Sequence, residues 1–435
     1  MAKQKFHLAW FTNFALDEWL EPFAAAGGNP WSGDFYVEMA QSLERACFDY
    51  IILEDTLMVS EAYGGSTRHY LKNSVQVPKH DPAPLAAVIG AQTRHLGVTA
   101  TLSTLGYPPF LLARLCATLD HITRGRFGWN IVTSGEDAAA QNFGLAKLPP
   151  HDLRYDIADE YMDLVNQLFA SWDPDAVVLD YESQTYADWT KVRPIHFEGK
   201  YYKSRGPLNT APSPQGRPTY IQAGGSPRGR DFAARHADSI IAAANGIKAM
   251  KEFRADVRAR AAKFGRNPDD IKVLYLLAPV LGETEAEAKE KNRRGLDDRR
   301  FQERALALYS ALSDIDLSKF DLDKPLPQLT TNGETTSLAR FAQFGSGKTL
   351  RQVLMEGGKG SSIDLVGTPD QVASQMGHVM EEVGGDGFLL KVPFNHINRR
   401  YILEITDGLV PALQRRGLVR TEYTRSTLRE TLREF

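Results

Sequence analysis

The sequence is poor in cysteine and in long hydrophobic runs. Its 435 residues include only two cysteines, Cys47 and Cys116, and neither belongs to a CxxC or Cys/His cluster. This disfavours a disulfide-stabilised scaffold and a structural zinc site, and the ten dispersed histidines predict no metal site of another kind. No stretch approaches the roughly 20 apolar residues that a membrane-spanning helix needs.

The sequence also lacks a strong excess of charge and a targeting signal. Lysine and arginine number 51 against 54 aspartates and glutamates, which gives a formal net charge of −3. Nucleic acids and anionic membranes require a dense Lys/Arg footprint, and the chain has no basic block that could supply it. The first residues pass directly into an apolar run without the hydrophobic core of a signal peptide. We therefore expect a cytoplasmic protein that binds neither nucleic acid nor membrane.

What the chain does have is a regular alternation of short apolar runs with longer helical patterns. The eight runs lie at 7–14, 50–53, 98–102, 126–132, 218–223, 239–243, 273–281 and 387–392. Strands separated by helices pair in parallel through right-handed crossovers. Eight such units predict an α/β fold of the (β/α)8 TIM-barrel type, which takes roughly 250 residues. A doubly wound open sheet would give a similar alternation and is the alternative.

The remaining length is expected in insertions into one barrel domain spanning residues 1–435. The clearest insertion follows a charged helical pattern at 284–312. Residues 313–362 are rich in Gly, Thr, Ser and Asp and lack a rhythm of strands and helices. Loops longer than about 15 residues are usually functional or disordered. We interpret this segment as an active-site lid placed before the last strand.

Polar residues gather where the predicted strands end, which is where a barrel carries its chemistry. Asp55 follows the second run, Thr101 lies near the end of the third, and Asn130 lies within the fourth. Asp55 could act as a general base or could cap the following loop. Asn130 interrupts an apolar run, and a buried amide needs hydrogen-bond partners. Such groups indicate a polar, planar ligand more than a hydrolytic pair of acids.

A glycine-serine turn after the fifth run suggests an anion site. Gly225 and Ser226 precede a predicted helix, whose N-terminus offers backbone N–H groups and a positive dipole end to a phosphate. The alternative is an ordinary strand-to-helix turn with Ser226 as N-cap. Tyr155, near the start of another predicted helix, could reach the same phosphate or could be a core residue.

Aromatic residues cluster in the loops after the first two runs. They are Phe11, Phe14, Trp19, Phe23, Trp31 and Tyr63. Such a cluster favours a flat, apolar or aromatic substrate. The alternative is ordinary packing. Phe11, Phe14, Trp19 and Tyr63 are the candidate pocket residues.

Several motifs in order along the chain carry a resemblance to a known family. They are YPPF at 107–110, WNIVTS at 129–134, NFG at 142–144, HDLRYD at 151–156 and QAGGSPRG at 222–229. With these motifs the chain resembles the bacterial-luciferase-like flavin monooxygenases. The subgroup that it resembles contains nitrilotriacetate monooxygenase, dibenzothiophene sulfone monooxygenase, pristinamycin synthase and long-chain alkane monooxygenase. The resemblance covers nearly the whole chain.

The resemblance implies a barrel that binds FMN at its mouth and a separate NAD(P)H:flavin reductase that supplies FMNH2. Dioxygen would be the cosubstrate, and a flavin peroxide would oxygenate or cleave a small organic, (hetero)aromatic substrate. The chain agrees with this scheme because it has no GxGxxG motif after a strand to hold a nicotinamide cofactor. A homodimer or homotetramer is expected.

The resemblance also implies roles for individual residues. Three would contact the flavin ring or ribityl chain: Asp55, Thr101 and Asn130. Three would hold the phosphate: Tyr155, Gly225 and Ser226. Asp55 and Asn130 are in addition the candidate catalytic residues.

Three other functions remain open at the level of sequence. A deazaflavin-dependent dehydrogenase of the same barrel superfamily would move hydride without oxygen. A flavin-degrading oxygenase would act on riboflavin itself. A non-catalytic flavin-binding protein would bind oxidised FMN without turnover.

Overall fold

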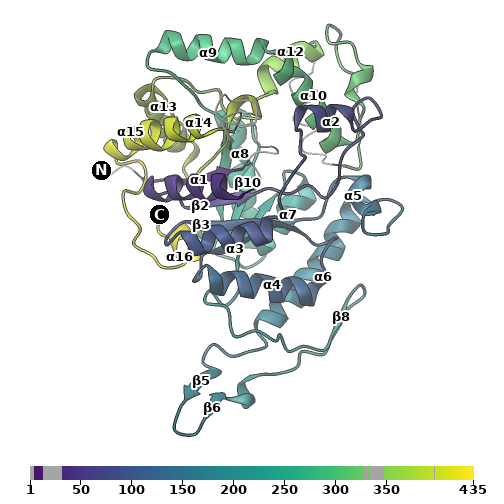
Figure 1. The fold of residues 1–435 in the computed structure, drawn as a ribbon, viewed down its shortest axis with the longest axis vertical. Helices are drawn as coiled ribbons and strands as arrows, with labels where there is room; N and C mark the ends of the chain where they lie inside the picture. The colour runs from purple at the N-terminus through teal and green to yellow at the C-terminus, as the bar shows by residue number, and fades with distance from the viewer. Residues whose placement is uncertain (1–3, 13–31, 328, 330, 334–346, 396) are drawn as a thin grey trace.

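A closed barrel of eight parallel strands forms the centre of the computed structural model, which describes residues 4–12, 32–327, 329, 331–333, 347–395 and 397–435 (Figure 1). The strands are β1 (His7–Phe11), β2 (Tyr50–Leu53), β3 (Gly97–Ser103), β4 (Phe127–Val132), β9 (Thr219–Ala223), β10 (Ser239–Ala242), β11 (Lys272–Leu277) and β14 (Gly387–Leu390). Around the barrel they follow the order β1-β14-β11-β10-β9-β4-β3-β2. Each of the eight predicted runs overlaps one barrel strand, so the TIM-barrel prediction is confirmed over the open sheet.

Helices surround the barrel and connect its strands. They are α1 (Asp34–Arg45), α3 (Pro82–Gln92), α4 (Pro109–Ile122), α6 (His151–Phe169), α7 (Pro227–His236), α8 (Gly246–Lys263) and α13 (Pro369–Val383), and α14 (Arg399–Leu403) and α15 (Val410–Arg415) follow the last strand. Their boundaries have local causes. Asp81, Ser226 and Thr368 are N-caps whose side chains accept a backbone N–H, and a proline follows each of them. Gly384, at φ +85°, ends α13.

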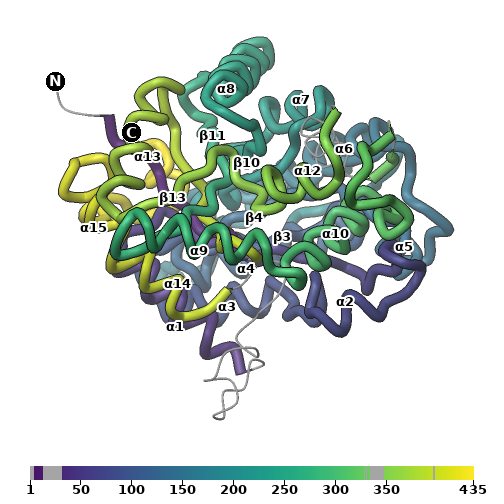
Figure 2. The backbone as a smooth tube through the Cα atoms, turned by 90° about the horizontal axis from the view of Figure 1, so that it is seen from above, coloured from purple at the N-terminus to yellow at the C-terminus, as the bar shows by residue number. Residues whose placement is uncertain are grey.

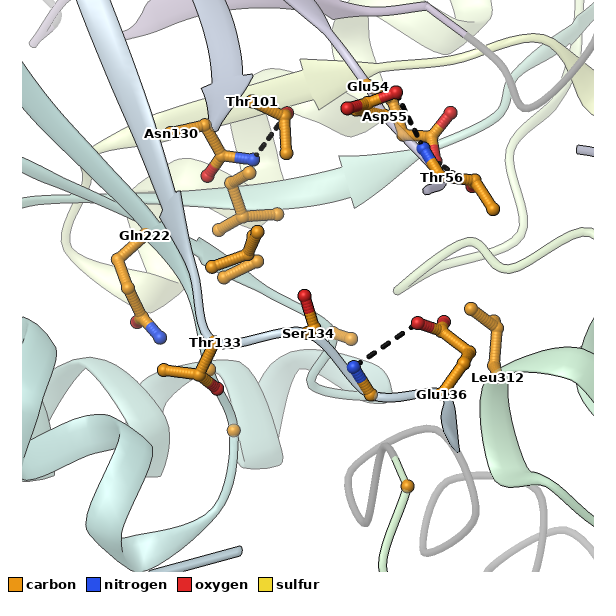
Figure 3. Close-up of a pocket in the computed structure, with 18 of the residues that line it drawn as sticks. Glu54, Asp55, Thr56, Thr101, Asn130, Thr133, Ser134, Glu136, Gln222 and Leu312 are labelled. Carbon is orange, nitrogen blue, oxygen red and sulfur yellow. Dashed lines mark hydrogen bonds between the residues drawn. The ribbon is translucent and has the colours of Figure 1, made fainter. Parts of the chain in front are cut away.

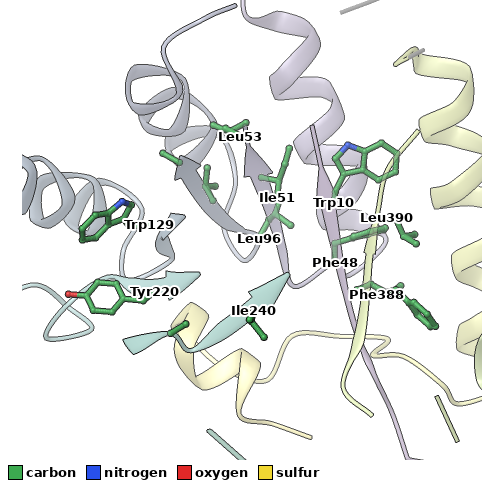
Figure 4. Close-up of a cluster of buried hydrophobic side chains, with 14 of the residues drawn as sticks. Trp10, Phe48, Ile51, Leu53, Leu96, Trp129, Tyr220, Ile240, Phe388 and Leu390 are labelled. Atoms are coloured by element: carbon green, nitrogen blue, oxygen red, sulfur yellow. The ribbon is translucent and has the colours of Figure 1, made fainter. Parts of the chain in front are cut away.

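Strand residues alternate between the surrounding helices and the barrel interior. In β2, Ile51 and Leu53 belong to the outer cluster against the helices, whereas Tyr50 and Ile52 belong to the inner cluster. Figure 4 shows the outer cluster, which includes the fully buried Trp10, Trp129, Tyr220 and Phe388 among others. Burying a side chain of this kind contributes about 1.5–3 kcal/mol. The same alternation means that inward-facing residues just beyond the strands project into the barrel mouth.

The last helix of the chain, α16 (Leu428–Leu432), closes the amino end of the barrel. Leu428 and Leu432 are buried in the inner cluster. Lys272 Nζ donates to the carbonyl oxygen of Phe435 at 3.1 Å, and the His7 ring stacks on the Phe435 ring at 4.6 Å. In Figure 1, α16 and the C-terminal end of the chain lie on the same side of the barrel. The amino end of the barrel is therefore filled by the chain itself.

The predicted insertion before the last strand is larger and more helical than expected. It contains α9 (Glu285–Asp297), α10 (Arg299–Ser313), η5 (Leu317–Lys319) and α12 (Leu350–Gly357), and β12 (Val280–Leu281) pairs with β13 (Val366–Gly367) beside it. Figure 2 shows α9 and α10 one after the other, with α12 near α10. The single helix predicted at 284–312 is wrong, because the chain turns at Asp298 (ψ 118°), whose side chain caps α10 by accepting the Arg300 N–H. Within the predicted lid, residues 328, 330 and 334–346 lie outside the described residues.

A second insertion, between α6 and β9, was not expected from the sequence. It contains β5 (Val177–Asp180) paired with β6 (Thr185–Ala187), and β7 (Phe197–Glu198) paired with β8 (Lys203–Ser204). This arm projects away from the barrel at the bottom of Figure 1. Leu179, Tyr181 and Trp189 are exposed on it. Strands of two to four residues exposed on both faces leave little period-two pattern, so the sequence gives no signal for them.

The remaining elements are short. They are α2 (Arg68–Asn73), α5 (Asp137–Gln141), η3 (Trp189–Lys191), η4 (Pro268–Asp270), η6 (Pro393–Asn395) and the π-helical turn η7 (Glu404–Leu409). In the described part of the chain, no helix has both the length and the apolar character needed to cross a membrane.

Candidate active site

A cavity of about 300 Å³ opens at the carboxyl end of the barrel. Its lining includes residues at the ends of all eight strands: Phe11, Glu54, Asp55, Thr101, Ser103, Asn130, Val132, Gln222, Ala223, Ile241, Ala243, Leu276 and Lys391. Cavities at this end are where barrel enzymes place their active sites. The six residues predicted to bind the cofactor all line it, and so does Phe11.

The other predicted pocket residues are placed differently. Tyr63 is not among the residues that line this cavity; its ring packs edge-on against His69, with 4.9 Å between the ring centroids. Phe14 and Trp19 lie outside the described residues, as do Phe23 and Trp31. Of the aromatic cluster, Phe11 is thus the member that the structure brings to the cavity.

At the ends of β3 and β4, an amide and a hydroxyl form one polar unit. Asn130 Nδ2 donates to Thr101 Oγ1 at 2.9 Å, as Figure 3 shows. Both side chains are buried, and the Asn130 Oδ1 atom has no hydrogen-bond partner among the described residues. The same holds for Gln222 Oε1 at the end of β9. Buried carbonyl oxygens of this kind fit a ligand that brings N–H or O–H donors.

At the end of β2, two adjacent carboxylates differ in their surroundings. The inward-facing Glu54 pairs with Lys79 and accepts the Thr56 hydroxyl at 3.0 Å. Asp55 accepts the Thr56 N–H at 2.9 Å. Burial raises the pKa of Asp55 to about 7, the charge of Glu54 adds to the rise, and Lys79 opposes it. Asp55 therefore makes a local capping contact and can also exchange a proton near neutral pH.

Where β9 meets α7, the glycine-serine turn is both a helix cap and part of the cavity wall. Ser226 Oγ accepts the Gly229 N–H at 3.0 Å, so the capping interpretation is realised. Gly225 and Ser226 also line the cavity, and His151 Nε2 lies 3.5 Å from Ser226 Oγ. The first N–H groups of a helix have no intrahelical acceptor, which makes this end of the ten-residue α7 suited to an anion.

Tyr155 reaches this same corner from α6. A Cβ atom added at Gly229 would lie 2.9 Å from the Tyr155 hydroxyl oxygen, so the phenol approaches the α7 backbone closely. The Tyr155 ring is buried against Phe232, with 5.5 Å between centroids. The ring of Tyr155 packs in the core, as one interpretation expected, and the residue also lines the cavity, so its contact with a phosphate stays a prediction.

Arg154 adds a cation that sequence reasoning did not single out. It is buried and lines the cavity, and it donates to the carbonyls of Pro149 at 2.8 Å and Asn332 at 3.1 Å. Its Nε has no partner among the described residues. Asn332 Oδ1 also accepts the His151 N–H at 3.1 Å. The insertion that carries Asn332 thus contacts the first turn of α6 beside the anion corner.

Some lining residues were missed although the sequence held a signal for them. Arg154 and His151 flank Tyr155 in the HDLRYD motif. Lys391 directly follows β14, so the search for polar residues at strand ends would have found it had it been applied to the last strand. No comparable signal identifies Lys79, the ion-pair partner of the lining residue Glu54, because it lies in a loop far from any strand end. Within the described ranges, no group of three His, Cys, Asp or Glu side chains is placed to hold a metal ion.

Comparison with known proteins defines the class. Residues 21–387 match the family described as luciferase-like monooxygenase. The chain belongs to this family.

Individual relatives are similar over almost their whole length. The chain is 36% identical to a long-chain alkane monooxygenase of Geobacillus thermodenitrificans, covering 92% of this chain and 86% of the relative. It is 37% identical to a dibenzothiophene-sulfone monooxygenase of Rhodococcus erythropolis, covering 92% and 90%. Among solved structures, a riboflavin lyase with modified FMN and riboflavin superposes with a TM-score of 0.88 at 34% identity, covering 99% of this chain and 96% of that one. The family, the monooxygenase class and the FMN cofactor predicted from the sequence are confirmed.

Proposed function

We propose that this chain is the oxygenase component of a two-component system, which binds reduced FMN in the barrel mouth and uses O2 to oxygenate or cleave a small organic substrate. One observation carries the proposal. Hydrogen-bonding groups at the ends of the neighbouring strands β2, β3, β4 and β9 form a continuous polar band that ends at the N-terminus of α7. A planar polar ring joined to a phosphate needs hydrogen-bonding partners along the ring and an anion site at one end, which is the order in which the band provides them.

The unpartnered atoms of this band fit the flavin. Asn130 Oδ1 and Gln222 Oε1 accept from ring N–H or ribityl hydroxyl donors, and Asp55 and Thr101 complete the contacts to the ring and ribityl chain. The phosphate is held by Tyr155, Gly225 and Ser226. His151 and Arg154 lie beside these three residues, and the Arg154 guanidinium adds positive charge to the same corner.

When bound, reduced FMN supplies the electrons that activate O2. The chain's own residues bind, orient and shield it. Asp55, with a pKa of about 7, would hold or release a proton at its carboxylate on the cavity wall. Asn130 orients the ring through its amide, which Thr101 fixes.

The insertion at 313–362 acts as the lid of this site in our proposal. Gly333, Gly358 and Gly360 line the cavity, and Asn332 contacts the start of α6. The insertion thus reaches the mouth from more than one side. A closed mouth excludes water, so that oxygen reaches the substrate before it leaves as hydrogen peroxide.

A flavin-degrading activity is the second candidate, favoured by the close superposition on riboflavin lyase. A deazaflavin-dependent dehydrogenase has weaker support, because the similarity to a solved F420-dependent alcohol dehydrogenase, at 14% identity, shows the fold alone. We further propose that a separate NAD(P)H:flavin reductase is the partner, that the protein is a homodimer or homotetramer, and that it works in the cytoplasm.

The decisive experiment supplies the purified protein with photoreduced FMN, 18O2 and a panel of flat aromatic compounds that includes riboflavin. We expect mass spectrometry to find one 18O atom in a product from a non-flavin compound. Label in a riboflavin fragment alone would favour the second candidate. Anaerobic turnover with reduced deazaflavin, without label in any product, would overturn the proposal.

A further inference from the structure

The two carboxylates that follow β2 differ in their charged neighbours. Glu54 and Asp55 both line the cavity. The side chain of Glu54 is 8% exposed, and it pairs with the ammonium of Lys79, whose side chain is 11% exposed. Because the pair is largely removed from water, the two charges attract each other more strongly than they would at the surface. Lys79 is not among the residues that line the cavity, so its charge acts there through Glu54.

Thr56 joins the two carboxylates into one unit. Its hydroxyl donates to Glu54 at 3.0 Å and its backbone N–H donates to Asp55 at 2.9 Å, and Figure 3 shows these three residues close together. Lys79 Nζ donates to the same hydroxyl oxygen at 3.4 Å. Carboxylates held this close titrate as a coupled pair, so the charge of one changes the proton affinity of the other.

The loop that brings Lys79 to this unit is held in an uncommon backbone conformation. Ser74 and Gln76 are buried and have φ values of +52° and +61°, a region that residues other than glycine rarely adopt. Val75 and Val77 are buried in one cluster with side chains of α10. A strained backbone persists only where the surrounding structure holds it, and such strain gathers at functional sites. Packing against α10 therefore fixes the loop that places the ammonium.

The charges at the end of β2 decide which carboxylate takes up a proton. Burial and the charge of Glu54 raise the pKa of Asp55 to about 7, and Lys79 opposes the rise. Burial also raises the pKa of Glu54, and Lys79 opposes this rise through both its charge and its hydrogen bond. Two like charges on neighbouring buried carboxylates are unfavourable, so one of the two tends to bind a proton. With its ammonium against Glu54, Lys79 favours the ionised form there and leaves the proton to Asp55.

Other titratable and charged groups surround the pair. They are Tyr36 of α1, His80 and Asp81 before α3, and Tyr107 before α4, together with Glu136, His151, Arg154 and Lys391 of the cavity wall. Asp81 adds to the rise in the pKa of Asp55. The two tyrosines stay neutral, because burial and nearby carboxylates raise the pKa of each phenol. All of these groups are unchanged in the variants below, so a difference between variants reports the charges of Glu54 and Lys79.

We propose that Lys79 is a positioning residue of the proposed reaction, which holds Glu54 ionised so that Asp55 is the carboxylate that exchanges a proton on the cavity wall. This inference rests on the proposed function, because that function gives the proton exchange at Asp55 its use. Without Lys79, the two neighbouring carboxylates would compete for one proton.

The test follows protonated carboxyl groups by infrared spectroscopy of the FMN-free protein between about pH 5.5 and 9. Ordinary carboxyl groups titrate near pH 4 and are ionised through this range. Asp55→Asn identifies the signal of the pair. The test variants are Glu54→Gln, Lys79→Met and the conservative Lys79→Arg. The control is Lys291→Met, because Lys291 forms an ion pair with Glu404 and neither residue lines the cavity.

We expect a carboxyl band in the wild-type protein that titrates with a midpoint near pH 7. Glu54→Gln should lower the midpoint by about one unit or more, because a negative neighbour of Asp55 is removed. Lys79→Met should raise the first midpoint of the pair by a similar amount, because loss of a cation increases the proton affinity of both carboxylates. Lys79→Arg and Lys291→Met should keep the midpoint within about half a unit of wild type.

An ion pair that served stability alone would lower the melting temperature in Glu54→Gln and Lys79→Met without opposite shifts of the midpoint. Midpoints that stay near the wild-type value in both variants, or that move in the same direction, would therefore overturn the inference. If Lys79→Met does not fold, Glu54→Gln decides alone, and an unchanged midpoint in that variant overturns the inference.

A parallel FMN titration across the same pH range separates this inference from the proposed function. The midpoint of the change in FMN affinity should follow the infrared midpoint in each variant. FMN binding whose pH dependence is the same in wild type, Glu54→Gln and Lys79→Met would overturn the inference while the proposed function stands. Failure of wild-type protein to bind FMN would instead overturn the proposed function, and the infrared midpoints of the FMN-free protein would still decide whether Lys79 keeps Glu54 ionised.

Discussion

At the scale of the residue, Ser226 tests the anion corner. Ser226→Ala removes a hydroxyl from the proposed phosphate site, so FMN binding should weaken by about 1–2 kcal/mol through loss of a charge-assisted hydrogen bond. The same change removes the N-cap of α7, which by itself costs about 0.5–2 kcal/mol of stability. Equilibrium titration with FMN and thermal unfolding measure the two effects separately.

Thr284→Ala is the matched control for this variant. Thr284 caps α9 in the same way, with its side chain accepting the Glu287 N–H, but it does not line the cavity. It should lower stability without a change in FMN affinity. An FMN dissociation constant that stays unchanged in Ser226→Ala would remove Ser226 from the phosphate role.

The environment of Asp55 predicts how the free energy of unfolding depends on pH. Its pKa rises from an ordinary 3.8 to about 7 in the folded protein, mainly through burial. Between pH 3.8 and about pH 7, the Asp55 carboxyl is protonated in the folded state but ionised in the unfolded state. The contribution of Asp55 to the free energy of unfolding therefore falls as the pH increases through this range. Asp55→Asn removes the effect and should be more stable than wild type at pH 8, by about 1–3 kcal/mol after allowance for partial exposure.

Denaturant unfolding of both proteins at pH 4, 6 and 8 measures this difference. The stability gap should open in favour of Asp55→Asn as pH rises and should be nearly closed at pH 4. FMN affinity of the wild type should change with a midpoint near pH 7, and that change should be absent in the variant. A gap that widens toward acid would contradict the assigned pKa.

The sequence predicted the site best where a polar residue interrupts an apolar strand. Asn130 stood out for this reason and Thr101 as a polar residue near the end of its run, and the structure joins them by a hydrogen bond. Lys79 could not be found in this way, because its pairing with Glu54 depends on how a long loop returns to the barrel. Tyr63 shows the converse, since an aromatic residue near a strand end can pack against neighbouring elements and still not line the cavity.

At the scale of the element, the contact between the insertion and α6 tests the proposed lid. Asn332→Ala removes the acceptor of the His151 N–H. A loosened insertion should admit water, so the share of reduced FMN lost as hydrogen peroxide during turnover should rise about twofold or more. A peroxidase-coupled assay with substrate present measures this share.

Asp323→Ala provides the control on the outer side of the same insertion. Asp323 is exposed and pairs with Arg351, and it does not line the cavity. It should leave peroxide release at the wild-type level. Equal peroxide release from wild type and Asn332→Ala would count against the lid.

Elements were predictable where their hydrophobic period was long and regular. All eight barrel strands were found because each is an apolar run followed by polar residues. The break between α9 and α10 could not be predicted from the sequence. Asp298 lies within a continuous charged helical pattern and acts as a cap only once the two helices separate. The projecting arm escaped because its short strands are mostly exposed.

At the scale of the whole molecule, the barrel has a sealed end and an open end. Leu432, 1% exposed, fills the sealed end. Leu432→Ala should lower the free energy of unfolding by about 2–5 kcal/mol through cavity formation. FMN affinity should stay at the wild-type level, because the proposed cofactor site is at the opposite end of the barrel.

Leu179→Ala on the exposed arm is the control and should change stability by no more than about 0.5 kcal/mol. Denaturant unfolding and FMN titration of the three proteins give both quantities. A loss of FMN affinity in Leu432→Ala that matches its loss of stability would show that the two ends are coupled.

The cavity rim carries hydrogen-bonding groups at the ends of β2, β3, β4 and β9 and apolar side chains at the ends of β1, β10 and β11, and this arrangement has a practical consequence for laboratory evolution. A library that randomises only Phe11, Ile241 and Leu276 would sample new compound preferences without touching the residues proposed to bind FMN. Three sites make a small library, and selection for a changed substrate range could then begin from variants that still fold and bind FMN.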